Sequence, residues 1–247
     1  YPSRGEIYDR NGKLLVYNDA IYDLMVIPRQ VRNLDTLAFC STMNISREYF
    51  NERMSKARRY SSFSPSVFMA QITKEEYGMI AENLHQYSGF YFQTRSVRNY
   101  PYPIAAHALG NIGEVNKKDL EIDSYYKGGD YIGKSGIESF YEKELRGEKG
   151  LKIIMVDVHN REKESFMDGQ YDTLPVPGKD IYLGIDAELQ AYGEALLKNK
   201  TGSIVAIEPS TGQVLALVTS PAYDPNQLVG RVRGENYSKL LNDSLKP

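Results

Sequence analysis

The chain has 247 residues, of which 41% are hydrophobic and 25% charged, proportions that are typical of a globular protein and exclude a collagen, a coiled coil or a wholly disordered chain. Thirty lysine and arginine residues against 32 aspartate and glutamate residues give a net charge of −2. No global positive excess therefore indicates nucleic acid or an anionic membrane as a partner.

The residues that bind metals and cofactors are scarce. One cysteine, Cys40, excludes an intrachain disulfide and a thiolate metal cluster. His85, His107 and His159 lack the spacing of metal ligands, and we expect neither a metal nor a cofactor. No apolar run reaches the ~18 residues of a membrane-spanning helix, and the chain opens at Tyr1 without an initiator methionine. We expect it to be a segment of a longer protein.

The first elements in chain order are predicted β-strands. Residues 5–8, 13–17 and 21–27 are rich in β-branched and aromatic side chains, which favour strands. Asn11 and Gly12 lie between the first two segments, and this dipeptide tolerates the positive φ angles of a tight turn. The sequence therefore predicts a β-hairpin at the start of the chain.

Two helices and a strand follow. Ser46 is a predicted cap of a helix that places Phe50, Met54 and Ala57 on one face. Thr73 and Glu76 have the spacing of a capping box, which predicts that a second helix starts there and ends before Gly89. Residues 90–94 are a predicted strand, and a short helix is expected to end at Gly110.

A further capping box, Ser135 with Glu138, predicts a helix that ends at Gly147. Residues 151–159 are a predicted strand, and the polar segment 160–179 contains two prolines, which indicates a domain boundary.

The last predicted elements form a strand, a helix and a hairpin. Residues 181–185 are the strand, and Asp186 caps a helix with three apolar side chains expected to point inward, namely Leu189, Tyr192 and Leu196. The hairpin joins 203–208 to 213–220 through a Pro-Ser-Thr-Gly turn.

One segment satisfies the letters of a phosphate-binding loop. Residues 128–135 read Gly-Gly-Asp-Tyr-Ile-Gly-Lys-Ser, and Lys134 and Ser135 would be the phosphate and magnesium contacts. Such a loop must leave a buried parallel strand, but residues 117–124 are too polar for one. We interpret the segment as a turn before a helix and keep a nucleotide-binding protein as an alternative.

Two motifs match those of penicillin-recognising enzymes. Ser124 and Lys127 fit S-x-x-K, and Lys200, Thr201 and Gly202 fit K-T-G. S-x-x-K chemistry needs a helical turn that brings the lysine amine to the serine hydroxyl. Gly128 follows at once and weakens any helix. We expect none of these residues to act, and likewise not Lys134.

Four segments resemble the class B penicillin-binding proteins. Residues 4–12 read Arg-Gly-Glu-Ile-Tyr-Asp-Arg-Asn-Gly, and the other similar blocks are 100–114, 133–150 and 202–226. The motif residues shared with the family are Arg4, Gly5, Asp9, Arg10, Gly12, Gly133, Ser135, Gly136 and Glu138. Within the class, the chain most resembles elongation-type members.

The resemblance implies an α+β fold in two parts. Residues 1–178 would form an elongated, non-catalytic pedestal, or dimerisation, domain of β-strands with an inserted mixed outer lobe at about 30–108. Residues 179–247 would be the first strand, helix and hairpin of the transpeptidase domain, which would end before the S-x-x-K nucleophile. The chain itself would then be inactive.

The resemblance also implies a function for the parent protein. It would cross-link peptidoglycan by a serine acyl-enzyme mechanism, on the periplasmic side of the membrane, held by an N-terminal helix that the chain lacks. Its partners would be a membrane glycosyltransferase and other cell-wall elongation proteins. A cell-envelope scaffold module unrelated to transpeptidases is the alternative.

We further hypothesise that Arg4, Asp9, Arg10 and Glu138 form one hydrogen-bonded network between the first strand and the helix after Ser135. Buried charges are costly unless they are paired.

Overall fold

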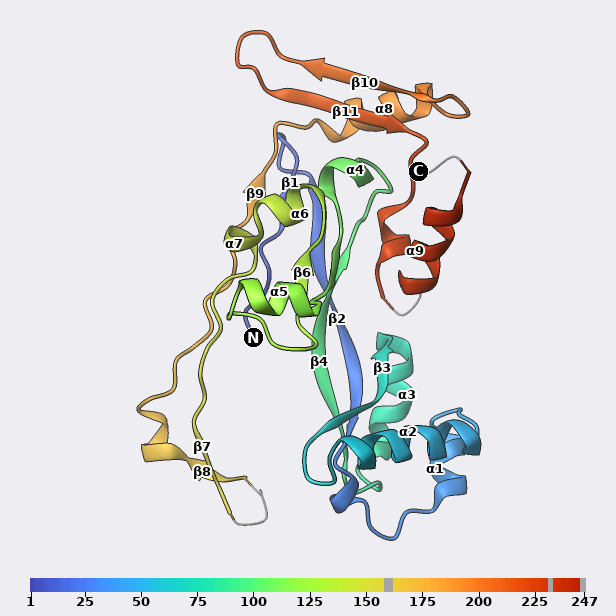
Figure 1. Cartoon of the computed structure of the whole chain (residues 1–247), viewed down its shortest axis with the longest axis vertical. Helices are drawn as coiled ribbons and strands as arrows, with labels where there is room; N and C mark the ends of the chain where they lie inside the picture. Colours follow the sequence, from blue (N-terminus) through green and yellow to red (C-terminus); the bar gives the residue numbers. More distant parts are fainter. Residues whose placement is uncertain (158–161, 231–232, 245–247) are drawn as a thin grey trace. The chain divides into compact units, whose positions relative to one another are not determined.

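The computed structural model describes residues 1–157, 162–230 and 233–244. The described residues form helices and mostly antiparallel strand pairs, which confirms the α+β class. The chain divides into two compact units (Figure 1): unit 1 contains Tyr1–Asp19, Arg98–Leu151 and Asp172–Pro247, and unit 2 contains Ala20–Val97 and Lys152–Tyr171.

The sheet of unit 1 is built around the first strand. β1 (Ile7–Tyr8) pairs antiparallel with the start of β2 (Leu14–Val26) and parallel with β9 (Ile181–Tyr182). This confirms the first hairpin, and Gly12 supplies the positive φ of its turn, +81°. The strands expected at 13–17 and 21–27 are one continuous strand, and the turn-favouring pair Asn18 and Asp19 between them does not interrupt it.

Short elements complete the middle of unit 1. They are α4 (Ala106–Leu109), β5 (Ile112–Glu114), α5 (Lys117–Ile122), β6 (Tyr131–Gly133), α6 (Gly136–Phe140) and α7 (Glu142–Leu145). The helix expected after Ser135 is therefore divided in two, because Tyr141 has non-helical angles, φ −100° and ψ 28°. The buried apolar residues of unit 1 that pack together are Ile7, Leu15, Val16, Tyr100, Ile104, Ala105, Leu109, Leu145 and Ala187.

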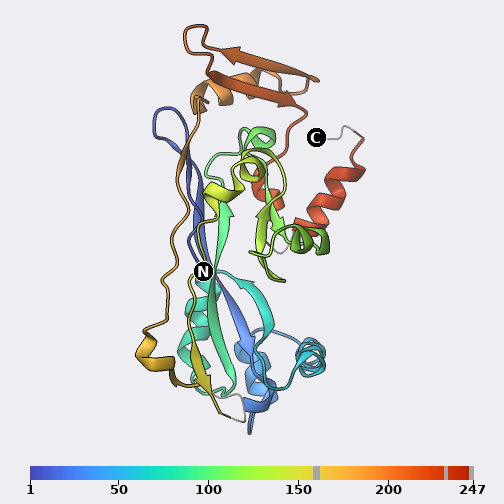
Figure 2. The same ribbon diagram turned by 60° about the vertical axis from the view of Figure 1, so that its left-hand side comes forward.

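The last part of unit 1 contains α8 (Ala187–Leu196), capped by Asp186, and the hairpin of β10 (Gly202–Ile207) and β11 (Val214–Ser220). These elements are confirmed, and α8 lies beside the hairpin in Figures 1 and 2. A 3₁₀ turn at Pro225–Leu228 and α9 (Arg233–Asn242) follow.

The predicted inward face of α8 is wrong. Leu189, Tyr192 and Leu196 are exposed. The helix instead turns Gln190 toward β11, where its amide donates to the carbonyl of Leu217 (3.0 Å) and its oxygen accepts from that residue's N–H (2.8 Å). A buried amide satisfied by two backbone bonds fits this close approach.

Unit 2 contains two groups of paired strands and three helices in its described part. The second half of β2 pairs antiparallel with β3 (Ser66–Ile72), and β2 also pairs with β4 (Phe90–Asn99). The helices are α1 (Thr36–Thr42), α2 (Arg47–Tyr60) and α3 (Lys74–Leu84). A 3₁₀ turn spans Pro28–Gln30, β7 (Ile154–Val156) pairs with β8 (Glu162–Ser165), and another turn spans Phe166–Gly169. The strand expected at 151–159 is shorter, and His159 lies outside the described residues.

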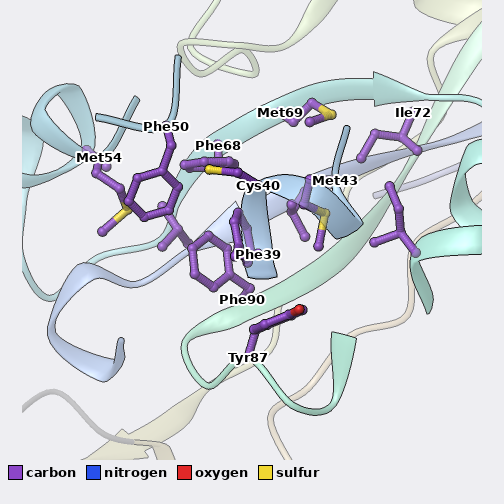
Figure 3. Close-up of a cluster of buried hydrophobic side chains, with 14 residues drawn as sticks. Phe39, Cys40, Met43, Phe50, Met54, Phe68, Met69, Ile72, Tyr87 and Phe90 are labelled. Carbon is purple, nitrogen blue, oxygen red and sulfur yellow. The ribbon is translucent and has the colours of Figure 1, made fainter. Parts of the chain in front are cut away.

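The core of unit 2 is aromatic (Figure 3). The ring of Phe39 lies 4.5 Å from that of Phe90 and 5.0 Å from that of Tyr87, centroid to centroid. Phe50, Met54 and Ala57 of α2 are buried, and the Ser46 cap and the Thr73–Glu76 capping box are present. These sequence predictions are confirmed. Cys40 is buried and unpaired, and burial raises the pKa of its thiol.

Candidate functional site: a buried charge cluster

The segment that carries Arg4 is fixed by its backbone. The N–H of Gly5 donates to the carbonyl of Leu145 at 2.8 Å, and the N–H of Gly178 donates to the carbonyl of Ser3 at 2.9 Å. A Cβ atom at Gly5 would lie 1.9 Å from the carbonyl oxygen of Lys179, so only glycine permits this approach. The backbone therefore holds Arg4 against α6 and α7.

Arg4 binds two glutamates. Its Nε donates to Oε2 of Glu138 (2.7 Å), while Nη1 and Nη2 donate to Oε1 and Oε2 of Glu142 (3.0 and 2.6 Å). Nη2 also donates to the backbone carbonyl of Glu138 at 3.0 Å. The forked contact with Glu142 is the bidentate geometry that suits a guanidinium best.

A second arginine binds the other oxygen of Glu138. Nε of Arg98 donates to Oε1 of Glu138 at 2.8 Å, and Nη1 donates to the side-chain oxygen of Asn18 at 3.0 Å. The side chains of Arg98 and Glu138 are 1% and 0% exposed. Asn18 in turn donates to the carbonyl of Arg4 at 2.5 Å. We call Arg4, Arg98, Glu138 and Glu142 the charge cluster.

The two positive and two negative charges of the cluster balance. Burial alone would lower the pKa of Arg4, but the charge of Glu138 and the hydrogen bonds with both glutamates outweigh burial and raise it. Glu142 also accepts from the hydroxyl of Tyr126 (2.7 Å) and the N–H of Gly133 (2.8 Å). Every carboxylate oxygen of Glu138 and Glu142 accepts a hydrogen bond. The cluster is therefore suited to stabilise the packing of the first residues on α6 and α7, and neither glutamate is free to act as a base.

The glycine motif after β6 allows a close backbone contact. Gly136 has φ +58°, and a Cβ atom there would lie 2.6 Å from the carbonyl oxygen of Ala108. The expected capping box is not formed. The hydroxyl of Ser135 donates to the side chain of Asn111 at 3.0 Å, and the carboxylate of Glu138 is occupied by the two arginines.

Asp9 and Arg10 lie outside the charge cluster, so the hypothesised four-residue network reduces to Arg4 and Glu138. Asp9 accepts from the N–H groups of Asn11 (2.8 Å), Lys13 (2.7 Å) and Ala187 (3.2 Å). Arg10 forms an ion pair with Glu208 at 3.6 Å. Both residues follow β1 in the turn, where Asp9 joins the first hairpin to the start of α8 and Arg10 joins it to Glu208 at the end of β10.

Residues 128–135, which match the phosphate-loop motif, do not have the structure of a phosphate loop. Residues 131–133 form β6, which pairs antiparallel with β5, whereas a phosphate loop leaves a parallel strand. The ammonium of Lys134 binds Asp119, and the N–H of Gly133 binds Glu142. These groups thus have protein partners.

The other two motif matches lie in separate elements. Ser124 lies in a turn after α5, and Lys127 lies in the irregular segment that follows it before β6, so no helical turn places the amine beside the hydroxyl. Lys200 donates to the carbonyl of Leu196 at 2.8 Å, and Thr201 immediately precedes β10.

Sequence reasoning missed three members of the site. Glu142 follows Glu138 by four residues, a spacing that predicts the same helix face and was a usable signal. Arg98 and Asn18 come from two strands and are 80 residues apart in the chain, so no local pattern links them. Only the strand pairing brings them together.

A family model, the penicillin-binding protein dimerisation domain, matches residues 1–183. The chain belongs to this family. The resemblance to penicillin-binding proteins that the sequence motifs indicate is thereby confirmed, and the charge cluster lies wholly within the matched residues of this penicillin-binding protein.

Curated relatives match the whole chain. The peptidoglycan D,D-transpeptidase MrdA of Salmonella typhimurium is 34% identical and that of Haemophilus influenzae 36%. Penicillin-binding protein 3 of Bacillus subtilis is 27% identical. All of the chain is covered in each case, but only 40%, 39% and 36% of these relatives. The chain thus spans well under half of their length.

Solved structures agree with these relatives. Penicillin-binding protein PBP2 of Helicobacter pylori, in its complex with MreC, superposes with a TM-score of 0.76 at 26% identity, over 100% of this chain and 47% of that one. PBP2 of the same organism without MreC gives a TM-score of 0.69 at 25% identity, with the same coverage.

Of the helices in the described residues, none is both long and apolar enough to cross a membrane. Within the same part of the chain, no three His, Cys, Asp or Glu side chains are grouped so that they could hold a metal ion.

Proposed function

We propose that this chain is the non-catalytic pedestal, with the start of the transpeptidase domain, of an elongation-type peptidoglycan D,D-transpeptidase. The observation that carries the proposal is the match of the whole chain to MrdA relatives at 34–36% identity. We propose residues 1–178 as the pedestal, with its outer lobe at about 30–108, and residues 179–247 as the beginning of the catalytic domain.

Contacts between β1 and residues 181–187 support a positioning role. The N–H groups of Ile181 and Leu183 donate to the carbonyls of Glu6 and Tyr8, both at 2.9 Å, and the N–H of Arg10 donates to Ile185 at 3.0 Å. The charge cluster fixes the same first residues to α6 and α7. A catalytic domain that starts at 179 would therefore have its first strand paired with a strand that is itself held in place.

The parent protein would cross-link peptidoglycan through a serine acyl-enzyme. It would act on the periplasmic face of the cytoplasmic membrane, anchored by an N-terminal helix. The partner named in the H. pylori complex, MreC, supports an elongation protein as a partner of this chain, and we extend the proposal to a membrane glycosyltransferase.

Labelling with a fluorescent β-lactam tests the proposal. We expect the full-length gene product to become covalently labelled and the 247-residue chain to remain unlabelled, because Ser124 and Lys127 lack the helical geometry of a nucleophile site. Ser124→Ala in the full-length protein should leave labelling unchanged. Labelling of the 247-residue chain that Ser124→Ala abolishes would contradict the proposal, and so would an unlabelled full-length protein.

A further inference from the structure

A concave site lies at the edge of the sheet of unit 1. Its volume is about 380 Å³, and its walls are formed by Arg10, Tyr182, Leu183, Gly184 and Gln213. Three kinds of group meet there: a strand backbone, an aromatic ring, and the polar side chains of an arginine and a glutamine.

The backbone of β9 is open on this side. Among the described strands, β1 is the only one that pairs with β9. Ile181 and Leu183 donate their N–H groups to β1. Because neighbouring residues of a strand direct their backbone groups to opposite sides, the N–H and C=O of Tyr182 point away from β1. An open strand edge of this kind is a template for an extended peptide.

The ring of Tyr182 covers the same edge. It stacks on the ring of its cross-strand partner Tyr8, with centroids 5.0 Å apart and planes 13° from parallel. Since Tyr8 lies on the β1 side, the other face of Tyr182 is turned toward the open edge. The residue is 67% exposed, so this face is available for stacking.

Two carboxylates, those of Glu6 and Asp180, lie near Tyr8. The hydroxyl of Tyr8 donates to Glu6 at 2.6 Å, and Asp180 accepts from the N–H of Glu6 at 2.8 Å. The hydrogen bond to Glu6, helped by burial and by the charges of Glu6 and Asp180, raises the pKa of Tyr8 to about 12. A negative potential beside an open aromatic face favours a cation.

The opposite end of the site carries hydrogen-bonding groups for a neutral chain. Arg10 contacts Glu208 through one terminal nitrogen, Nη2, and a guanidinium has five N–H donors. Its charge is already balanced by that glutamate, so the remaining donors suit backbone carbonyls better than a carboxylate. The carboxamide of Gln213 can both donate and accept.

We propose that this edge binds an extended peptide segment that carries a lysine or arginine. The peptide backbone pairs with Tyr182, its cation covers the open ring face beside Glu6 and Asp180, and its carbonyls meet Arg10 and Gln213. The inference rests on the geometry of unit 1 and is independent of the proposed enzymatic function.

A titration of the ¹⁵N-labelled chain with acetyl-Thr-Val-Lys-Val-Thr-amide tests the proposal. We expect the amide resonances of Tyr182, Leu183 and Gly184 to shift with peptide concentration. Tyr182→Ala should weaken binding by roughly three- to tenfold, the loss of one cation–π contact. Tyr192→Ala is the matched control, because Tyr192 is 62% exposed on α8 and should leave the affinity unchanged.

Further probes separate the alternatives. The peptide with glutamate in place of lysine should bind at least about tenfold more weakly, because it would face the same carboxylates. Equal binding of the two peptides, equal effects of the two tyrosine variants, or no shift at all would overturn the proposal. It would also be overturned if an N-acetylglucosamine oligosaccharide shifted these resonances while the peptides did not, or if they moved with protein concentration alone.

Discussion

Glu138 receives hydrogen bonds from two arginines while it is removed from solvent. Each carboxylate oxygen has its own guanidinium, Oε2 from Arg4 and Oε1 from Arg98. In a medium of low dielectric constant, this pairing offsets part of the desolvation of the three charges, although burial outweighs it for Arg98 and lowers the pKa of that guanidinium. Glu138 therefore pairs with both arginines, while Arg4 also pairs with Glu142.

Glu138→Gln should destabilise the protein strongly. The amide keeps the shape of the side chain but removes the negative charge between the two arginines, which leaves buried positive charge incompletely paired. The expected loss in the free energy of unfolding is about 3–5 kcal/mol, the usual cost of breaking a buried pair. Urea unfolding followed by circular dichroism measures it.

Glu144→Gln provides the control for this variant. Glu144 is an exposed residue of α7, and surface charges contribute under about 1 kcal/mol. If the two variants had the same midpoint of unfolding, the cluster would not contribute to stability.

Among the elements, helix starts were the most predictable features. The side chains of Ser46, Thr73 and Asp186 cap α2, α3 and α8 as their positions predict, because a cap depends only on neighbouring residues. Ser135 has the same sequence signal but binds Asn111. Tertiary contacts can therefore override a local cap.

Short elements were less predictable. The heptapeptide helix α1 was missed although Asp35 caps it, because seven residues give too little apolar periodicity to distinguish a helix. β5 and β6 have three residues each, and their pairing depends on the loop between them. The face of α8 was mispredicted because Gln190, a polar residue, is the one that is buried.

Asp186→Ala should shorten or loosen α8. Asp186 accepts from the N–H groups of Glu188 and Leu189, both at 3.0 Å, and from Asn11 at 3.1 Å. Removal of such a cap costs about 1 kcal/mol. Thermal unfolding at pH 7 measures the loss, and Asp186→Asn, which keeps an acceptor oxygen, should recover most of it.

The same carboxylate makes stability depend on pH. The backbone hydrogen bond from Leu189, with further hydrogen bonds from Asn11 and Glu188, lowers the pKa of Asp186 in the folded state. The contribution of its charge is thus complete above its unfolded pKa of about 3.9, and it is lost as the pH falls through the lower folded value. The stability difference between wild type and Asp186→Asn should shrink below about pH 4, and a constant difference would contradict this.

At the scale of the whole molecule, the two compact units do not correspond to a division of the chain at one point. Unit 1 combines three separate segments, two from the proposed pedestal and one that includes residues 179–247. The boundary at about 179 that the polar, proline-containing segment indicates stays a prediction, and the return of the chain to β1 gives no local signal. Pairing between distant strands is decided by burial and register.

Limited proteolysis examines the proposed second domain. Val205, Ile207 and Leu217 of the β10–β11 hairpin are exposed apolar residues, so this pair of strands packs on one face only. Trypsin should cleave at Lys198 and Lys200, before β10, earlier than at Arg53 and Lys56 within α2. Mass spectrometry identifies the first cuts, and early cleavage in α2 with an intact hairpin would contradict the division at about 179.

The two residues of β1 also bear on how the protein forms during synthesis. β1 needs β9 as its parallel neighbour, and the contact between Glu6 and Asp180 joins residues 174 positions apart. Arg4 likewise can form its ion pair only after Glu138, 134 positions later, has been synthesised. The core of unit 2 draws on residues 24–90, which leave the ribosome much earlier. Because contacts between distant residues form slowly, the residues of β1 reach their final partners late, although they are translated before the core of unit 2.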